Sequence, residues 1–269
     1  MKRNGNLLLA TAGALLLVAL GTESAQAGGG LASGQVVHTA TPQTFSYTTG
    51  QYYWSVVAVQ PTASSAYDLY LDDAQNDFLG ESAYGTGLTN FVAVDSNTGT
   101  RPFQTYDAEV TQYTAGSYWI EASYGTSEVT IPTPTHHGTT GFADPDIAYM
   151  NLNSNAVVSI SDIYLTAGQS FWASTPVASS ELFLLEANPA YSSTFVQTRA
   201  TATIHQSAKV VDNCTLYTAS VSGWHALVLI DDTPPVTTNP QQGIAFGLHR
   251  YDPSTPNYCP MADFPAATP

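Results

Sequence analysis

The sequence predicts an all-β protein, with two tandem antiparallel β-sandwich domains after a signal peptide. Three observations predict it. A short block of sequence occurs twice, strand-forming Thr, Val, Tyr and Phe residues are abundant, and the N-terminus is basic and then apolar. Turn-forming residues recur at short intervals and helical periodicity is nearly absent, as is typical of all-β sandwiches.

The first 27 residues have the features of a secretory signal peptide. Lys2 and Arg3 precede an apolar run from Leu7 to Leu20, and Ala25-Gln26-Ala27 supplies the small residues of a cleavage site. This run is short for a transmembrane helix, and no later stretch has the roughly 20 apolar residues of a membrane span. We therefore predict cleavage near Ala27 and a protein that is secreted or held at the cell surface, without membrane insertion.

Two repeated blocks predict the domain organisation. Thr48-Thr49-Gly50-Gln51-Tyr52-Tyr53-Trp54 returns as Thr166-Ala167-Gly168-Gln169-Ser170-Phe171-Trp172, and Asp68-Leu69-Tyr70-Leu71 returns as Glu181-Leu182-Phe183-Leu184. Two copies of one domain are the natural interpretation. The predicted limits are residues 28–132 for the first domain, 133–146 for a linker and 147–269 for the second domain.

Residue patterns within the repeats predict which side chains are buried. Leu69 and Leu71 alternate with polar residues, as do Tyr118, Ile120 and Ala122 with Trp119 and Glu121, which predicts strands with one buried face. The run from Trp224 to Ile230 is apolar on both faces and suits a central strand. Gly50 and Gly168 fit turns that need a positive φ or close packing. Trp54 and Trp172 fit a core role better than a ligand platform.

The chain contains two cysteines, Cys214 and Cys259, which in an exported protein predict one disulfide closing a loop of about 45 residues. Such a bridge would join the proline-rich C-terminal tail to the second domain and stabilise it by ~3–4 kcal/mol. The alternative is a pair of free thiols in a metal or redox site, which the absence of a Cys-x-x-Cys pair disfavours. Between the domains, His136 and His137 could bind a metal, but a solvated linker fits them better.

The chain is strongly acidic, with a formal net charge of −15. Cleavage would remove Lys2, Arg3 and Glu23 and leave four basic against twenty acidic side chains, a charge of about −16. Nucleic acid and anionic membrane surfaces repel such a chain, so neither is an expected partner. Solubility explains this charge better than a general role in cation binding.

The repeated turns and strands resemble the bacterial pre-peptidase C-terminal (PPC) domain. The resemblance rests on the Thr-x-Gly-Gln turn before an aromatic strand, the Asp-Leu-x-Leu strand, and two turns that lead into aromatic strands, Tyr113–Trp119 and Tyr217–Trp224. It implies small jelly-roll-like β-sandwiches of the kind appended to secreted peptidases, and relatives in collagenases bind collagen and calcium. No appended enzyme accompanies the two domains here.

Acidic residues concentrate in the first repeat, where Asp68, Asp72, Asp73 and Asp77 are candidate calcium ligands. Closely spaced carboxylates suit the oxygen-ligand preference of calcium and repel one another without a cation. The alternative is a solvated acidic surface. No cofactor is required by any motif, and calcium is the one metal that the sequence suggests.

No catalytic motif is present: the chain has no Gly-x-Ser-x-Gly, His-Glu-x-x-His or phosphate-binding glycine loop. We therefore predict a secreted, non-catalytic binding or adhesion protein, with an extracellular polysaccharide or matrix protein as ligand. A structural envelope protein, or a partner of a separately encoded secreted enzyme, is the alternative, and a small secreted hydrolase is the third. The candidate contact residues are Tyr52, Trp119, Asp72 and Asp73. The oligomeric state stays open.

Overall fold

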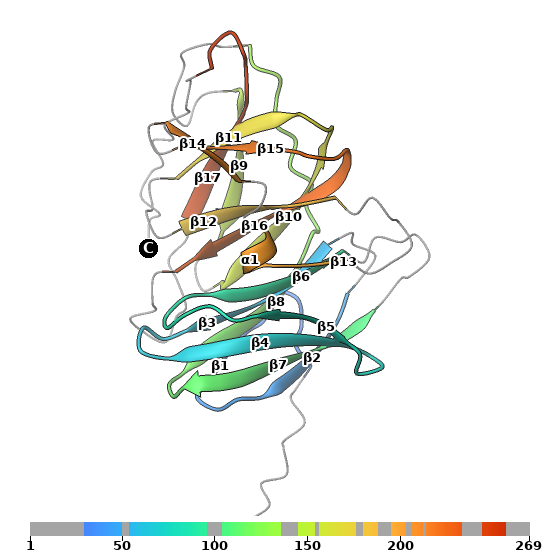
Figure 1. Cartoon of the computed structure of the whole chain (residues 1–269), viewed down its shortest axis with the longest axis vertical. Helices are drawn as coiled ribbons and strands as arrows, with labels where there is room; N and C mark the ends of the chain where they lie inside the picture. The colour runs from blue at the N-terminus through green and yellow to red at the C-terminus, as the bar shows by residue number, and fades with distance from the viewer. Residues whose placement is uncertain are drawn as a thin grey trace, which may run out of the picture.

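The computed structural model describes residues 30–49, 54–95, 104–135, 145–153, 156–175, 180–187, 195–202, 206–211, 214–232 and 244–256. Four antiparallel sheets stack to form two β-sandwiches, one above the other in Figure 1. The predicted all-β fold class is confirmed.

The first sandwich has the strand order of a jelly roll. Its outer sheet has the order β2-β7-β4-β5, and its inner sheet has the order β1-β8-β3-β6, extended by β13. In chain order this is the 2-7-4-5 and 1-8-3-6 arrangement of an eight-stranded jelly roll. The strands are β1 (Val36–Thr39), β2 (Thr44–Thr48), β3 (Trp54–Pro61), β4 (Ala66–Asp73), β5 (Phe78–Ser82), β6 (Asn90–Asp95), β7 (Thr105–Thr114) and β8 (Tyr118–Tyr124).

The second sandwich repeats this topology with one difference. Its inner sheet, β10-β16-β12, matches β2-β7-β4, and its outer sheet, β9-β17-β11-β15, matches β1-β8-β3-β6 and gains β14 at the edge. The elements are β9 (Ile147–Leu152), β10 (Val158–Leu165), β11 (Ser170–Ser174), β12 (Ser180–Leu185), β13 (Phe195–Thr198), α1 (Arg199–Ala202), β14 (Gln206–Val211), β15 (Cys214–Thr218), β16 (Gly223–Asp231) and β17 (Ile244–Arg250).

β13 is the strand that departs from the repeat. It follows β12 in the chain, as β5 follows β4, so the repeat would place it beside β12. Instead it pairs antiparallel with β6 of the first sandwich, with Val196 opposite Val94. The inner sheet of the first sandwich is therefore completed by a strand from the second repeat, which ties the two sandwiches together.

The repeated residues occupy equivalent places. Trp54 and Trp172 lie in β3 and β11 and are buried, and Gly168 has a positive φ of 81°, as predicted. The turns Tyr113–Trp119 and Tyr217–Trp224, in contrast, are not equivalent. The first connects β7 to β8, and the second connects β15 to β16, whose counterparts in the first sandwich are β6 and β7.

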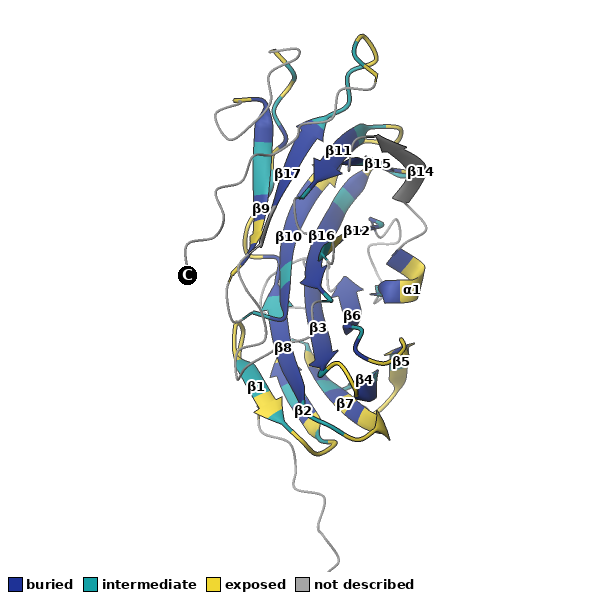
Figure 2. Cartoon of the chain, turned by 90° about the vertical axis from the view of Figure 1, so that its left-hand side faces the viewer, coloured by how far each residue is buried: buried dark blue, intermediate teal, exposed yellow. Residues whose placement is uncertain are grey.

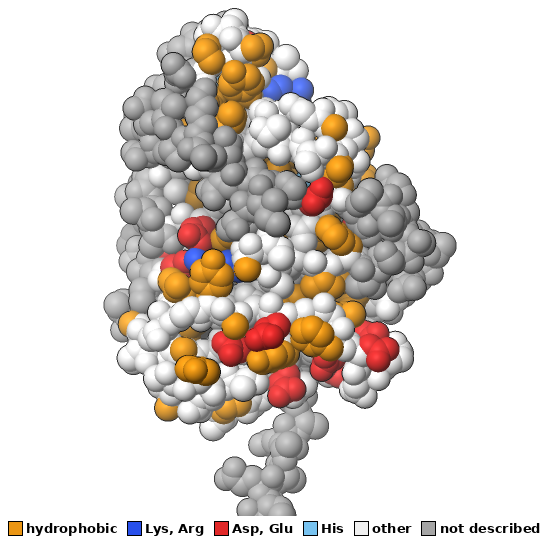
Figure 3. All heavy atoms as spheres, in the orientation of Figure 1, with side chains coloured by type: hydrophobic (Ala, Val, Ile, Leu, Met, Phe, Trp, Pro, Cys, Tyr) orange, Lys and Arg blue, Asp and Glu red, His pale blue; other side chains and the backbone are white. Residues whose placement is uncertain are grey.

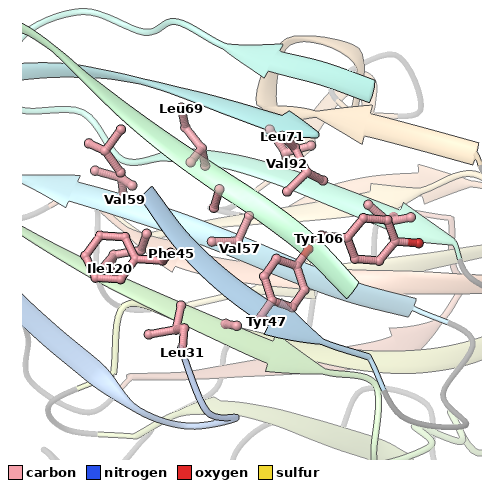
Figure 4. Close-up of a cluster of buried hydrophobic side chains, with 14 of the residues drawn as sticks. Leu31, Phe45, Tyr47, Val57, Val59, Leu69, Leu71, Val92, Tyr106 and Ile120 are labelled. Carbon is pink, nitrogen blue, oxygen red and sulfur yellow. The ribbon is translucent and has the colours of Figure 1, made fainter. Parts of the chain in front are cut away.

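The core of the first sandwich lies between its two sheets, and Figure 4 shows its side chains pointing toward one another from β2, β3, β4, β6 and β7. Leu69, Leu71, Ile120 and Tyr118 are buried here, as the alternation predicts. The prediction that β8 has one buried face is wrong, because Trp119 and Glu121 on the opposite face are also buried.

A third core explains this burial, because the two inner sheets pack face to face. Trp54, Val56 and Ala58 on β3 belong to it, while Val57 and Val59 on the same strand belong to the first core. Phe183, Val228 and Ile230 meet them from the second sandwich. Figure 2 shows the resulting continuous buried strands in the middle of the molecule. We call this contact the inter-sandwich interface.

The chain joins the second sandwich earlier than the predicted linker. Val129 N donates to Asp162 O at 2.8 Å, and Ile131 is buried in the core of the second sandwich. Thr135 donates to the carboxylate of Asp146 from its backbone N and from Oγ1. Residues 136–144, with both linker histidines, lie outside the described residues. The first sandwich thus ends near Tyr124, before the predicted boundary at residue 132.

Candidate functional site

The solvent face of the first outer sheet gathers carboxylates and aromatic rings on a regular strand framework. Leu69 and Leu71 point into the core, so the alternating residues Asp68, Tyr70 and Asp72 face outward. Cross-strand register places two rows side by side on this face: Ser46, Asp107, Asp72 and Phe78, then Thr44, Glu109, Tyr70 and Glu81. We call these residues and Asp68 the acidic sheet face.

The rows have a regular spacing set by the sheet. Neighbours within a row are about 5 Å apart, and the rows are about 7 Å apart along the strands. Tyr70 therefore lies between Glu109 and Glu81 in its row, and between Asp68 and Asp72 on its strand. An aromatic ring is surrounded by hydrogen-bond acceptors on a rigid surface.

The electrostatics of the acidic sheet face are uniformly negative. Its strands β2, β4, β5 and β7 contain no Lys or Arg. Partial burial and the neighbouring Glu81 raise the pKa of Asp68, and burial together with Glu81 raises the pKa of Tyr70. Asp72 and Asp107 lie directly opposite each other, an arrangement that costs stability. Ser46 Oγ donates to Asp107 Oδ1 at 2.5 Å and offsets part of this cost.

Aromatic side chains on and beside this face are accessible. Phe78 is 61% exposed in its row, and Tyr113, near the end of β7, is 83% exposed. Figure 3 shows acidic and hydrophobic side chains intermixed at the lower end of the molecule. Exposed apolar groups that gather on one surface are typical of contact sites, so these aromatic residues beside the outward-facing Tyr70 make the face a contact candidate.

The structure does not gather the four candidate calcium ligands. Asp68 and Asp72 are four residues apart on one strand, which separates them by about 13 Å. Asp73 Oδ1 accepts hydrogen bonds from the N atoms of Gln75 and Asp77, both at 2.9 Å, and so shapes the turn between β4 and β5. Asn76 completes this turn with a positive φ of 61°. Within the described ranges, no three His, Cys, Asp or Glu residues are placed to hold a metal ion.

The candidate contact residues have different positions. Asp72 lies on the acidic sheet face and Asp73 is the last residue of β4, next to the turn, whereas Tyr52 lies outside the described residues. Trp119 is only 2% exposed, because the second inner sheet covers its side of β8 and the ring of His38 stacks on it at 4.5 Å. The expectation that Trp119 forms a contact surface is therefore wrong.

Cys214 is fully buried at the start of β15, next to Trp172. No described cysteine is a free thiol. Cys259 lies outside the described residues, so the Cys214–Cys259 bridge stays a prediction.

An ionic cluster around the buried Arg199 crosses the inter-sandwich interface at the end of β13. Arg199 donates to both carboxylate oxygens of Asp232, at 2.9 and 2.5 Å, and also to Glu181. Its Nη1 donates to the carbonyl of Thr89 in the first sandwich at 2.6 Å. The guanidinium lies 4.7 Å from the centre of the Tyr84 ring. Burial lowers the pKa of Arg199, but the hydrogen bond and charge of Asp232, together with Glu181 and Tyr84, raise this pKa above its usual value.

Glu121 forms a second polar contact across the interface. Its Oε2 accepts hydrogen bonds from the N atoms of Val157, at 2.6 Å, and Val158, at 3.3 Å, where β10 begins. Burial raises the pKa of Glu121, and these two amides oppose the shift. The sequence pattern does not indicate that Glu121 and Arg199 are buried. The scarcity of basic residues could have directed attention to Arg199, since the predicted mature chain has only four basic side chains to pair with its many carboxylates.

No family model and no curated protein matches this chain. Among solved structures, it is similar to one named "putative secreted protein" from Eubacterium rectale, with 8% identity and a TM-score of 0.22, over 80% of this chain and 72% of that one. Similarity at this level carries no argument about fold or function. Within the described residues, no helix is long and apolar enough to cross a membrane.

Proposed function

We propose that the chain is a secreted, non-catalytic binding protein that holds a neutral extracellular polysaccharide on its acidic sheet face. The observation that carries the proposal is the row of Thr44, Glu109, Tyr70 and Glu81, beside the row that ends in Phe78. Aromatic rings stack on the apolar faces of sugar rings, and the flanking carboxylates and hydroxyls accept hydrogen bonds from sugar hydroxyl groups.

The charge of the chain favours a neutral polysaccharide over an acidic one. The acidic sheet face has no basic side chain on its strands, and a formal net charge of −15 repels uronic-acid or sulfated polymers. The sheet also presents its side chains without the ordering cost that a mobile loop would pay on binding. These features together support a preformed platform for an uncharged polymer.

Retention on insoluble materials tests the proposal. The mature chain is incubated with cellulose, chitin, starch granules, pectin and gelatin, and the bound fraction is measured against protein concentration. We expect retention on at least one neutral polysaccharide, and about 5- to 30-fold weaker binding for Tyr70→Ala and Phe78→Ala, which corresponds to 1–2 kcal/mol per contact residue.

Tyr164→Ala is the matched control, because Tyr164 is an exposed aromatic residue on β10 of the second sandwich, away from the acidic sheet face. This variant is expected to bind as the unmodified chain does. Retention on gelatin alone would assign the face to a matrix protein instead. Retention that is unchanged in Tyr70→Ala and Phe78→Ala would place the binding surface elsewhere, and no retention on any material would remove the proposal.

A further inference from the structure

Two acidic side chains face the inter-sandwich interface from opposite sheets, far from the acidic sheet face. Asp95 is the last residue of β6 and is 2% exposed, while Asp162 lies in the middle of β10 and is 5% exposed. Charged groups are rarely buried to this extent without a partner of opposite charge.

Among the described residues, Asp162 has no such partner. Its Oδ1 is buried and accepts no hydrogen bond from this part of the chain. The carboxyl group packs against the backbone of Gly125, where a Cβ atom would lie 2.0 Å from Oδ1. The backbone of Asp162 is held in place, because its N donates to Ser127 O at 2.9 Å. The side chain therefore has no simple way to turn toward solvent.

The described titratable groups around Asp162 do not neutralise it. Asp95 on β6 and the exposed Glu128 are both acidic and act on it electrostatically. β3 has no titratable side chain, and on β8 Glu121 is held by amides at the start of β10. On β16, His225 Nδ1 lies 3.0 Å from Gly223 O. Burial, followed by Asp95 and Glu128, raises the pKa of Asp162 to about 8.

We propose that Asp162 is a proton-dependent contact between the two sandwiches, which keeps the interface closed while it is protonated and weakens it when it ionises beside Asp95. The protonated side chain is uncharged and is tolerated in the interface. Ionisation places a buried negative charge beside Asp95 without a described counterion for Asp162, and the unfavourable burial and electrostatic contact favour separation of the two inner sheets.

The sign of the stability change follows from the two protonation states. The unfolded chain loses the proton near pH 4, whereas the folded chain keeps it until about pH 8. Folding is therefore favoured by this group below pH 4, and the advantage is lost as the pH rises toward 8. Between these limits, the folding equilibrium constant changes by up to tenfold per pH unit on account of Asp162.

Urea unfolding of the mature chain from pH 5 to pH 9 tests the proposal, with Asp162→Asn as the variant. Asparagine has nearly the same shape and cannot ionise. We expect the ratio of the unfolding equilibrium constants of the unmodified chain and the variant to rise by up to tenfold per pH unit up to about pH 8. Glu109→Gln, which removes an exposed carboxylate from the acidic sheet face, is the matched control and is expected to follow the unmodified chain.

A native-state measurement separates opening of the interface from global stability. Hydrogen exchange of the amides of Val157 and Val158, corrected for intrinsic base catalysis, is expected to accelerate above pH 8 in the unmodified chain and to stay protected in Asp162→Asn. Parallel pH profiles for the two proteins would overturn the proposal. Both experiments are repeated with millimolar calcium and with chelator. If calcium abolishes the pH dependence, a bound cation neutralises Asp162 in place of the proton, and the proposal is overturned.

Discussion

At the scale of single residues, Arg199 is a buried basic side chain that stabilises the contact between the two sandwiches. Arg199 joins three segments: α1, the carboxylates of Asp232 and Glu181 in the second sandwich, and the carbonyl of Thr89 in the first. We expect Arg199→Ala to lower the free energy of unfolding by about 3–5 kcal/mol, because it leaves the mostly buried carboxylate of Asp232 without its cation.

The Arg199 prediction is checked by urea unfolding at neutral pH. Arg250→Ala is the control, since Arg250 is partly exposed and donates one hydrogen bond, to Ile131 O at 3.1 Å. It is expected to cost less than half as much. Arg199→Lys keeps the charge but loses the paired contact with Asp232, and an intermediate loss is expected. Equal stability of all the variants would show that the cluster contributes little.

At the scale of the strand, β13 comes from the second repeat and is held in the first sandwich by close packing as well as by pairing with β6. Gly80 on β5 lies against it, and a Cβ atom there would be 2.8 Å from Val196 Cγ1 and 3.5 Å from Val92 Cγ1. Valine is stiff, so it cannot move aside at low cost. We expect Gly80→Ala to destabilise the protein by about 1–3 kcal/mol through overpacking.

A double-mutant cycle checks this contact. Val196→Ala removes the colliding methyl groups, so Gly80→Ala is expected to cost clearly less in that background, with a coupling of about 0.5–3 kcal/mol measured by urea unfolding. Val59→Ala is the matched background, because Val59 is buried in the same core but is not among the atoms near Gly80. An equal cost of Gly80→Ala in all backgrounds would contradict packing of β5 on β13.

The strand scale also shows what the sequence predicts and what it leaves open. Alternation at Leu69 and Leu71 identified the inward face of β4, because the other face of that sheet meets solvent. Alternation did not predict the burial of Trp119, because the second sandwich covers the outer side of β8 and both faces of this strand are buried. Local periodicity reports burial, not which element provides it. The pairing of β13 with β6 could not be predicted either, because nothing in the four-residue sequence of β13 indicates which sheet it joins.

The candidate site was predictable only in part. The cluster of Asp68, Asp72, Asp73 and Asp77 directed attention to β4, where the acidic sheet face lies. Its other half, with Asp107 and Glu109, comes from β7, about 40 residues further along the chain, and only the strand register brings it opposite. The buried Asp162 lies in β10 where the apolar residues change from one face, with Ile160, to the other, with Ile163. Both the acidic sheet face and the burial of Asp162 depend on contacts between residues far apart in the sequence, so only the three-dimensional structure shows them.

At the scale of the whole molecule, the two sandwiches form one structural unit. They share the core of the inter-sandwich interface, the strand β13 and the hydrogen bonds of Glu121 and Arg199. Trp54 Nε1 and Gln60 Nε2 add donors to carbonyls of the second sandwich, at 3.3 and 2.9 Å. Such an interface resembles a domain core more than a contact between independent domains.

One cooperative unfolding transition is therefore expected, although the chain contains two repeats. Leu69 and Leu229 are fully buried in the cores of different sandwiches, so Leu69→Ala and Leu229→Ala form a matched pair. Each substitution is expected to lower the free energy of unfolding by about 2–5 kcal/mol and to move the same calorimetric transition to a lower temperature. The calorimetric and van't Hoff enthalpies of that transition are expected to be equal. Two transitions, each moved by only one of the variants, would show instead that the sandwiches fold independently. In that case the interface that carries Asp162 would be a docking contact between separate domains, and its opening would leave both folds intact.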